Sequence, residues 1–317
     1  MKKIYILIAL LTLVWALSAT RYAGEIFQIT SGVANQAMGN TGLTNTDALS
    51  SGWWNPALLS FAPARGVELS RSEHFEGLLE QNQASLILGK NLRGSIIINH
   101  LGINNIKLTE LEDPADSLSN ENRPQVWKTI GNNDFIVYGA FARQISQGFS
   151  LGLAPKLAYR SLADHSGYAF GADLGLLWLA DRDLSLGANL RDFFSTQVIW
   201  ENGTYEVVIP NLDLEASYGF GLLKGTVPVK LSLRTQLMAE GRGEAATLST
   251  GLISADFHGG LSITPIQQLT FLGGYDVDCL TAGLALRYKD FGLDYAFRGN
   301  AQDGIGSTQK VSLSYRW

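Results

Sequence analysis

The feature that most constrains this chain is an alternation of apolar and polar side chains with a period of two, which recurs from about residue 66 to the last residue. It is clearest in residues 306–317, where Val311, Leu313, Tyr315 and Trp317 alternate with Lys310, Ser312, Ser314 and Arg316. Successive side chains of a β-strand point to opposite sides of the sheet, so this period predicts strands with one apolar face. The predicted fold class is therefore all-β.

Turn residues divide the alternating region into fifteen candidate strands, whereas single-chain outer-membrane barrels have an even number of strands. We therefore predict about 14 antiparallel strands and expect one candidate within residues 246–276 to be miscounted or merged. The candidates are 66–72, 81–89, 93–103, 133–144, 149–160, 167–180, 183–193, 211–221, 227–239, 246–254, 256–264, 268–276, 278–288, 290–299 and 306–317.

The first residues have the pattern of a secretory signal. Lys2 and Lys3 precede an apolar run over residues 4–17, and Ala16, Ser18 and Ala19 are small residues suited to cleavage. The alternative is a membrane-anchoring helix, which needs roughly 20 apolar residues and a stop-transfer flank. We predict a signal peptide over residues 1–19.

After this signal no stretch has the apolar length of a transmembrane helix, so a membrane-spanning structure must be a closed barrel. A soluble barrel of the lipocalin kind or a secreted β-sandwich would show the same alternation, because periodicity does not say which face is inside. The export signal and the aromatic residues at strand ends favour lipid outside. We predict a transmembrane barrel over residues 63–317, in contact with the lipid of the cell outer membrane.

Two segments interrupt the strand pattern. Residues 104–132 contain five acidic residues and two prolines and are predicted to form an acidic extracellular loop. In residues 200–205, Asn202-Gly203 between apolar residues predicts a tight hairpin, because both turn positions require a positive φ.

Residues 28–62 have no period-two pattern and are rich in small residues, and we assign residues 20–62 to one segment before the first strand. We predict that they form a compact hatch, or plug, inside the barrel, with residues 55–57 against the inner wall near the first strand and Asp47 as a helix cap. The hatch residues singled out are Gly39, Gly42, Asp47, Asn55, Pro56 and Ala57.

This segment resembles the N-terminal hatch of the long-chain fatty-acid transporter (FadL-like) superfamily of outer-membrane barrels. The small-residue stretch at 34–42 and the Asn55-Pro56-Ala57 sequence carry the resemblance. Residues 134–175, 282–297 and 306–317 are similar to the shorter PorV/PorQ branch, which is associated with type IX protein secretion. The terminal Tyr315 and Trp317 resemble the signal read by the barrel-assembly machinery, which the resemblance implies as a partner.

Other chemistry is weakly represented. A net charge of -5 provides no electrostatic footprint for nucleic acid, and the four histidines are too scattered to predict a metal site. Residues 148–152 match G-x-S-x-G, but Ser150 lies in an alternating strand where a nucleophile would need a strand-to-helix turn. We therefore expect no enzymatic activity and no cofactor.

Charged residues on the polar face are predicted to form a salt-bridged, hydrated lumen rather than a ligand site. They are Lys156, Arg160, Asp173, Arg191, Arg234, Arg287, Asp294 and Arg298.

Two functions follow from these observations. The first is a PorV/PorQ-type role in protein secretion or cell-surface delivery, with secreted proteins or secretion-system components as partners. The alternative is a FadL-like channel that takes up hydrophobic small molecules across the outer membrane. The short chain favours the first function, and the charged lumen face argues against an apolar passage.

Overall fold

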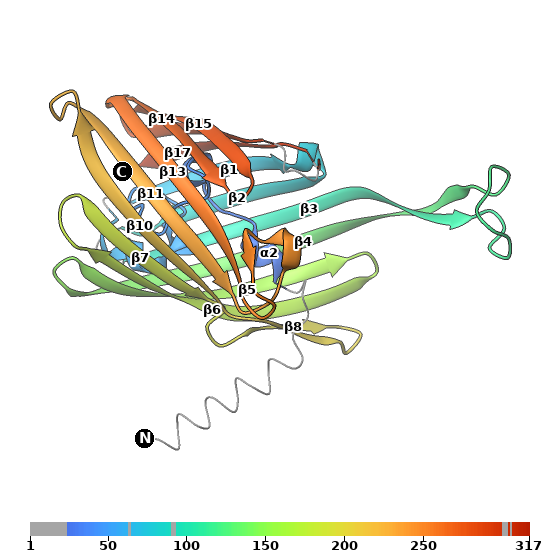
Figure 1. Ribbon diagram of the computed structural model, residues 1–317. Coiled ribbons are helices and arrows are strands. Elements are labelled where there is room, and N and C mark those ends of the chain that lie inside the picture. The colour runs from blue at the N-terminus through green and yellow to red at the C-terminus, as the bar shows by residue number, and fades with distance from the viewer. Residues whose placement is uncertain (1–23, 63–64, 90–92, 300–303, 305) are drawn as a thin grey trace, which may run out of the picture.

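The computed structural model is a closed antiparallel β-barrel with strongly tilted strands (Figure 1). The structure describes residues 24–62, 65–89, 93–299, 304 and 306–317. The predicted signal peptide, residues 1–19, lies outside the described residues.

Fourteen strands form the wall, and each pairs antiparallel with its neighbours. The first and last strands close the barrel, with Gly66 opposite Arg316 and Glu73 opposite Gln309. In order around the wall they are β1 (Gly66–His74), β2 (Leu79–Ile87), β3 (Gly94–Leu111), β4 (Pro124–Ser146), β5 (Phe149–Leu162), β6 (His165–Leu179), β7 (Leu184–Arg191), β10 (Asn211–Leu222), β11 (Val227–Met238), β13 (Ser254–Ile266), β14 (Leu269–Asp276), β15 (Cys279–Tyr288), β16 (Phe291–Arg298) and β17 (Thr308–Arg316).

The predicted count of 14 strands is confirmed, and the surplus candidate is the run at 246–254. Only β12 (Leu248–Ser249) forms there, paired with Ala255 and Ser254 of β13, after the short 3-10 helix η4 (Gly243–Ala245). The wall is closed without it because β11 pairs directly with β13, from Val229–Ile263 to Met238–Ser254.

The apolar face of the wall points outward. On β5, Leu157 is 62% exposed, whereas its neighbour Lys156 is 2% exposed, and the same alternation runs along the other strands. A soluble barrel would have the charged face in water and the apolar face inside. The structure therefore has the arrangement of a transmembrane barrel, whose outer face is apolar and whose lumen is polar.

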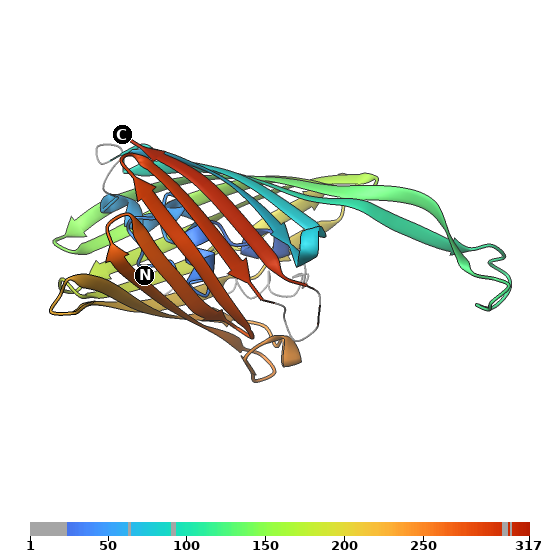
Figure 2. The same cartoon turned by 90° about the horizontal axis from the view of Figure 1, so that it is seen from above.

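The prediction of an acidic loop at 104–132 is wrong for most of its length. Strands β3 and β4 continue to Leu111 and from Pro124, so that only residues 112–123 are outside them. The paired strands project beyond the wall as a long ribbon (Figure 2). Both faces of this ribbon are in solvent, so its sequence lacks the apolar and polar contrast that identifies the other strands.

The predicted hairpin at 200–205 is present. Strands β8 (Thr196–Trp200) and β9 (Tyr205–Val208) flank its turn, and β8 pairs with β6 from Gly167–Trp200 to Phe170–Gln197. Among the described residues no helix combines the length and apolarity that a membrane span requires.

The two ends of the barrel differ. We call the end with the β3–β4 ribbon, the β8–β9 hairpin and residues 239–253 the long-loop end. The opposite end carries the tight connections at 147–148, 180–183 and 289–290, and we call it the short-turn end.

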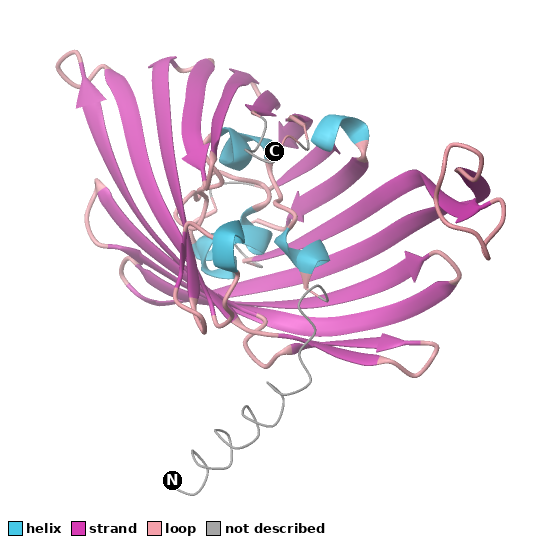
Figure 3. Cartoon of the chain, turned by 45° about the vertical axis from the view of Figure 1, so that its right-hand side comes forward, coloured by secondary structure: helices cyan, strands magenta, loops and turns pink. Residues whose placement is uncertain are grey.

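The short helices before β1 lie within the curve of the sheet (Figure 3). They are α2 (Glu25–Gln28), α3 (Val33–Ala37), α4 (Ser51–Trp54) and the 3-10 helix η2 (Pro56–Ser60). A further 3-10 helix, η3 (Phe75–Gly77), connects β1 to β2 instead.

Candidate functional site

The lumen segment, residues 24–62, packs against inward-facing side chains of the wall. Its second part, α4 and η2, contacts β3, β4, β5 and β6 through an apolar cluster. Trp53 and Trp54 are 2% and 0% exposed and meet edge to face, with ring centroids 4.9 Å apart. Leu58 is also fully buried there, together with Ile97 and Ile136 of the wall. This part of the segment forms a continuous core with one side of the barrel.

Hydrogen bonds complete the attachment of α4 and η2. The amide of Asn55 donates to the carbonyl oxygens of Leu43 (3.0 Å) and Leu176 (2.9 Å), and its oxygen accepts from the amide of Ala57 (3.1 Å). Ser150 Oγ donates to the carbonyl oxygen of Ala57 at 2.7 Å. The serine of the G-x-S-x-G match is therefore a buried wall residue on a strand that continues to Leu162.

Two glycines bring the wall close to these residues. A Cβ added at Gly152 would lie 2.4 Å from the nitrogen of Ala57, and one at Gly175 would lie 2.1 Å from Asn55 Oδ1. Residues 55–57 accordingly lie against β5 and β6, and their predicted place near the first strand is wrong. Gly152 and Gly175 make this position possible, because a side chain at either wall residue would overlap residues 55–57.

The first part of the segment crosses the other side of the lumen as the Met38–Thr44 loop. Gly39 has φ +64°, and its amide donates to Thr281 Oγ1 at 2.9 Å. A Cβ on Gly39 would lie 2.2 Å from the carbonyl oxygen of Gly259, so only glycine fits against this wall. A Cβ on Gly42 would similarly lie 2.2 Å from Asn35 Nδ2.

Polar contacts to ionisable wall side chains hold the Met38–Thr44 loop. Glu215 on β10 accepts from the amides of Gly42 (2.7 Å), Leu43 (3.0 Å) and Thr44 (3.2 Å) and from Thr44 Oγ1 (2.7 Å). Arg234 on β11 donates to the carbonyl oxygen of Asn40 at 2.9 Å. Met38 also packs in an apolar cluster with Leu272, Ala285 and Ala296 of the wall, so the loop is held by apolar contact at Met38 and by charge-assisted hydrogen bonds at residues 40–44.

Asp47 does not have the predicted capping role. The helix α4 begins at Ser51 with Ser50 as its N-cap residue, and Asp47 is exposed near the short-turn end. Its carbonyl oxygen accepts a hydrogen bond from Arg316 Nη2 at 2.6 Å. Asn55 is the residue whose side chain caps a helix, because it precedes η2 and accepts from the second amide of that helix.

The charges singled out from the sequence lie on the inward face and form pairs. The pairs are Lys156 with Asp173 (2.8 Å) and Asp192 (2.6 Å), Arg160 with Asp134 (3.0 Å), Arg191 and Arg234 with Asp213 (2.7 and 2.9 Å), Arg298 with Asp276 (2.7 Å) and Arg287 with Asp294. Three of these cations also contact the lumen segment, since Lys156 lies over Phe27, Arg191 over Trp53 and Arg234 over Trp54.

Several anions of this network were not predicted from the sequence, including Asp213, Glu215 and Asp276. Residues 212–215 read Leu-Asp-Leu-Glu, so the alternation itself places both acids of β10 on the inward face. Glu215, Arg234, His258 and Asp276 are successive cross-strand partners on β10, β11, β13 and β14. The register between strands places these four side chains in one row across the wall. The sequence of a single strand does not contain that register, so the row could not be predicted from it.

Two cavities lie on the side of the lumen that the Met38–Thr44 loop crosses. One, of about 240 Å³, is toward the long-loop end and is lined by Asn40, Arg234 and His258 among others. The second, of about 430 Å³, is toward the short-turn end and is lined by Met38, Thr41 and Gly42. Residues of the same loop thus line both cavities, and the loop lies between them.

Within the described residues, no group of three or more His, Cys, Asp and Glu side chains has the geometry to hold a metal ion. The lumen is instead a set of paired charges around a packed segment and two cavities.

No protein-family model and no curated protein sequence matches the chain. Its fold is similar to that of several solved structures. The Ralstonia pickettii toluene transporter TbuX has a TM-score of 0.57 at 12% identity, over 90% of this chain and 98% of that one. The monoaromatic hydrocarbon channel CymD has a TM-score of 0.55 at 11% identity, over 91% and 97%. A Pseudomonas aeruginosa FadL homologue has a TM-score of 0.54 at 11% identity, over 91% and 98%.

These similarities span nearly the whole of both chains. At 11–12% identity they show a shared barrel fold and nothing finer.

Proposed function

We propose that this protein is an outer-membrane channel for small molecules in which the Met38–Thr44 loop is the gate. This is the second function considered from the sequence, and we now prefer it to protein secretion. The observation that carries the proposal is the position of the loop, which separates two lumen cavities inside a closed barrel. The similarity in fold to toluene and monoaromatic hydrocarbon channels supports it.

The contacts on either side of the loop suggest how it could open. Its polar wall partners include Glu215, Arg234, Asp276 and Thr281, and hydrogen bonds to such groups are replaceable by water during a local opening. The neighbouring residues 51–60 are packed in an apolar core, which water cannot replace in the same way. We infer that solute passes when the loop leaves its wall contacts while α4 and η2 stay in place.

A disulfide lock tests this gate. Thr44 Oγ1 and Ser217 Oγ are 2.8 Å apart, so the double variant Thr44→Cys/Ser217→Cys places two thiols together between loop and wall. The background carries Cys279→Ser, because Cys279 is the lone native cysteine. Uptake of labelled toluene would be measured in Gram-negative cells with the full chain in their outer membrane.

We expect uptake to fall to that of cells without the chain when the lock is oxidised, and to recover on reduction. Each single-cysteine variant, treated with the same oxidant, is the control. Uptake that is unchanged with a fully formed disulfide would contradict the proposed gate.

The protein-secretion hypothesis stays a prediction, and the same cells test it. Deleting residues 112–123 removes the tip of the β3–β4 ribbon without touching the wall or the lumen segment. A channel should then keep its uptake, whereas a secretion factor that uses this ribbon should lose display of secreted proteins.

A further inference from the structure

The cavity toward the short-turn end offers a solute a mostly polar surface. Lys230 on β11 and Ser262 on β13 are cross-strand partners, and both are half-buried. Thr264 and Thr270 are also half-buried, and their hydroxyl oxygens lie 3.0 Å apart across β13 and β14. All four side chains line this cavity of about 430 Å³. Since none of the four is fully buried, a solute inside the cavity can reach them.

The apolar residues of the same cavity are less accessible. Met38, Leu272 and Ala285 are 7%, 8% and 6% exposed, because they pack in one small cluster. Ala34, which adds a single methyl group, is half-buried. Burial of a hydrocarbon is favourable where apolar surface surrounds it. In this cavity a hydrocarbon would instead face hydroxyl and charged groups and displace their water.

Two cations of the cavity have hydrogen-bond donors left for a solute. Lys230 Nζ donates to the carbonyl oxygen of Thr44 at 3.1 Å, and Arg316 Nη2 donates to that of Asp47 at 2.6 Å. Among the described residues neither side chain has a second hydrogen-bond partner. A lysine carries three N–H donors and an arginine five, so most of them remain available.

The charges of this cavity nearly balance. Its carboxylates are Asp47 and Glu215, and its cations are Lys230, Arg287 and Arg316. Arg287 is paired with Asp294, which leaves two cations against two carboxylates. An ion that enters the cavity loses hydration without meeting a surplus of opposite charge, and this loss is costly.

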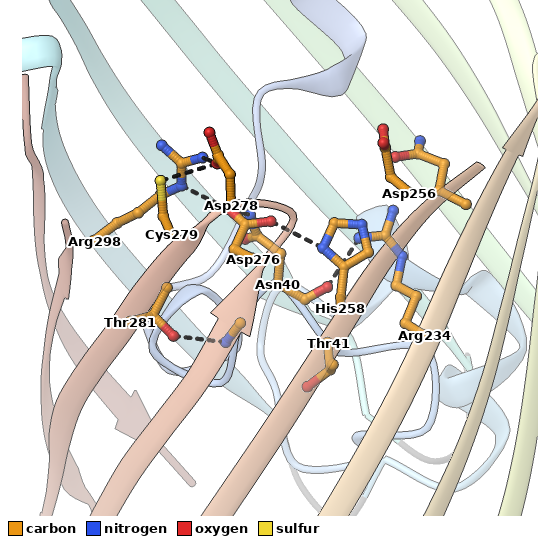
Figure 4. Close-up of polar contacts among 12 residues, drawn as sticks. Asn40, Thr41, Arg234, Asp256, His258, Asp276, Asp278, Cys279, Thr281 and Arg298 are labelled. Carbon is orange, nitrogen blue, oxygen red and sulfur yellow. Dashed lines mark hydrogen bonds and ion pairs between the residues drawn. The ribbon is translucent and has the colours of Figure 1, made fainter. Parts of the chain in front are cut away.

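The charged groups of the cavity toward the long-loop end are engaged with one another as well. Asp276 lies 2.7 Å from Arg298 Nε and 2.9 Å from His258 Nδ1 (Figure 4). Asp256 is paired with Arg242. Neither cavity therefore favours an ion of one sign, and a neutral solute avoids the cost of desolvating a charge.

The hydrophilic surface continues to the short-turn end. A further cavity of about 410 Å³ shares Lys230, Ser262 and Thr264 with the first. It is also lined by Asp183, which belongs to the tight connection at 180–183. A solute that has passed the Met38–Thr44 loop thus finds polar side chains along the rest of its way.

We propose that the channel selects a small neutral solute rich in hydroxyl groups, namely a monosaccharide or a polyol. Its oxygens accept from Lys230 and Arg316, and its hydroxyl groups exchange hydrogen bonds with Ser262, Thr264 and Thr270. A cavity of roughly 150 Å³ holds benzene, so cavities of about 240 and 430 Å³ have room for one six-membered ring. This inference rests on the proposed channel function, because it names the solute class that the channel selects.

The test compares three probes of one size that differ in charge: glucose, glucuronate and glucosamine. Influx of each labelled probe into liposomes that contain the full mature chain would be measured at about pH 6, where the amine is protonated. We expect glucose to enter well above the rate of empty liposomes. Both ions should enter about tenfold more slowly than glucose, because they lose hydration without a free counter-charge.

Removing hydroxyl groups from the wall locates the effect. Thr264→Val/Thr270→Val keeps the shape of both side chains and should slow glucose influx about tenfold, as the loss of one or two hydrogen bonds implies. Thr235→Val on β11 is the matched control, since Thr235 is also half-buried but lies outside the residues that line this cavity. Heat-modifiable mobility checks that each barrel is folded.

Changing the charge balance should change the order of the two ions. Asp47→Asn removes an exposed carboxylate and leaves a positive surplus, so glucuronate influx should rise relative to that of glucosamine while glucose influx stays the same. Asp290→Asn is the control, because Asp290 is exposed in the connection at 289–290 and does not line the cavity.

Glucose influx no faster than that of empty liposomes, or no faster than that of both ions, would overturn this inference. The Thr44–Ser217 lock, applied to glucose influx as well as to toluene uptake, decides the channel proposal separately. Toluene uptake that the lock stops, without glucose influx, leaves the channel and removes the solute class. Glucose influx that the lock does not alter leaves the solute class and removes the gate.

Discussion

The two parts of the lumen segment are attached to the barrel by different forces. Residues 51–60 bury two tryptophans and most of the 3-10 helix η2 against β3–β6. The Met38–Thr44 loop crosses a glycine-lined wall, where Met38 packs in a small apolar cluster and the loop forms hydrogen bonds with Glu215, Arg234, Asp276 and Thr281. One segment of chain thus contains an anchor, residues 51–60, which is held by apolar burial, and a loop, Met38–Thr44, which is held largely by hydrogen bonds.

The two kinds of attachment contribute to the free energy of unfolding in different ways. A buried tryptophan removes about 150–250 Å² from water, which stabilises the folded state by roughly 4–6 kcal/mol at 25 cal/mol per Å². A hydrogen bond to a charged group contributes about 1.5–3 kcal/mol and is exchanged for one to water when the contact opens. The anchor thus depends mainly on apolar burial, whereas the loop depends on several such hydrogen bonds together with the burial of Met38.

The largest effect on stability is expected from removing a buried tryptophan of the anchor. Trp54→Ala should destabilise the folded protein by about 3–5 kcal/mol, because the cavity left behind is surrounded by packed side chains. Urea unfolding of the detergent-solubilised chain, followed by the heat-modifiable mobility of the barrel, measures it. Trp127→Ala on the exposed ribbon is the control, and an equal loss in the two variants would show that the anchor is not a core.

A smaller effect is expected from pushing the anchor off the wall. Gly152→Ala places a methyl group 2.4 Å from the nitrogen of Ala57 and should destabilise by about 1–3 kcal/mol through overpacking. Gly139→Ala on β4 provides the comparison, since its added Cβ meets nothing within 4 Å. If the Gly139→Ala and Gly152→Ala variants unfold at the same urea concentration, the close contact between Gly152 and Ala57 does not contribute to stability.

Loosening the loop should change movement more than stability. Glu215→Gln weakens the acceptor of four hydrogen bonds from residues 42–44 while preserving its shape. We expect faster protease cleavage within residues 38–47 and faster uptake, with a stability loss of about 1–2 kcal/mol at most. Glu110→Gln on the ribbon should leave cleavage and uptake unchanged, and a slower uptake in Glu215→Gln would contradict a loop that opens.

The smallest effect is expected at a wall turn that touches neither part of the segment. Asp181 accepts from the amides of Leu184 and Asp183, and these bonds lower the pKa of its carboxyl group below the usual value. A lowered pKa means that the stabilisation is present above the unfolded pKa and is lost as pH falls through the folded one. Asp181→Asn should therefore reduce stability slightly at neutral pH and not below the folded pKa, with uptake unaltered at every pH.

The barrel was predictable from the sequence because period two is a local property. Lys156 and Leu157 alternate in the chain as they do in the wall. Counting such runs gave fifteen candidates, and the even number of strands in single-chain outer-membrane barrels reduced them to 14. The ribbon at 104–132 was not predictable, because both of its faces meet water and leave no contrast to read. The run at 246–254 was misassigned since alternation over a few residues does not ensure a pairing partner.

The site depended on information that no single strand carries. Asn55, Pro56 and Ala57 were identifiable as a motif, but their contact with Gly152 and Gly175 joins positions about 100 residues apart. His258 and Asp276 appeared as isolated residues until β13 and β14 placed them side by side. Local alternation thus determined the wall and its inward charges. The tertiary structure decided which charges pair, which part of residues 24–62 is anchored and where the cavities lie. These features depend on the register between strands and on the wall glycines, and both are set only when the barrel closes.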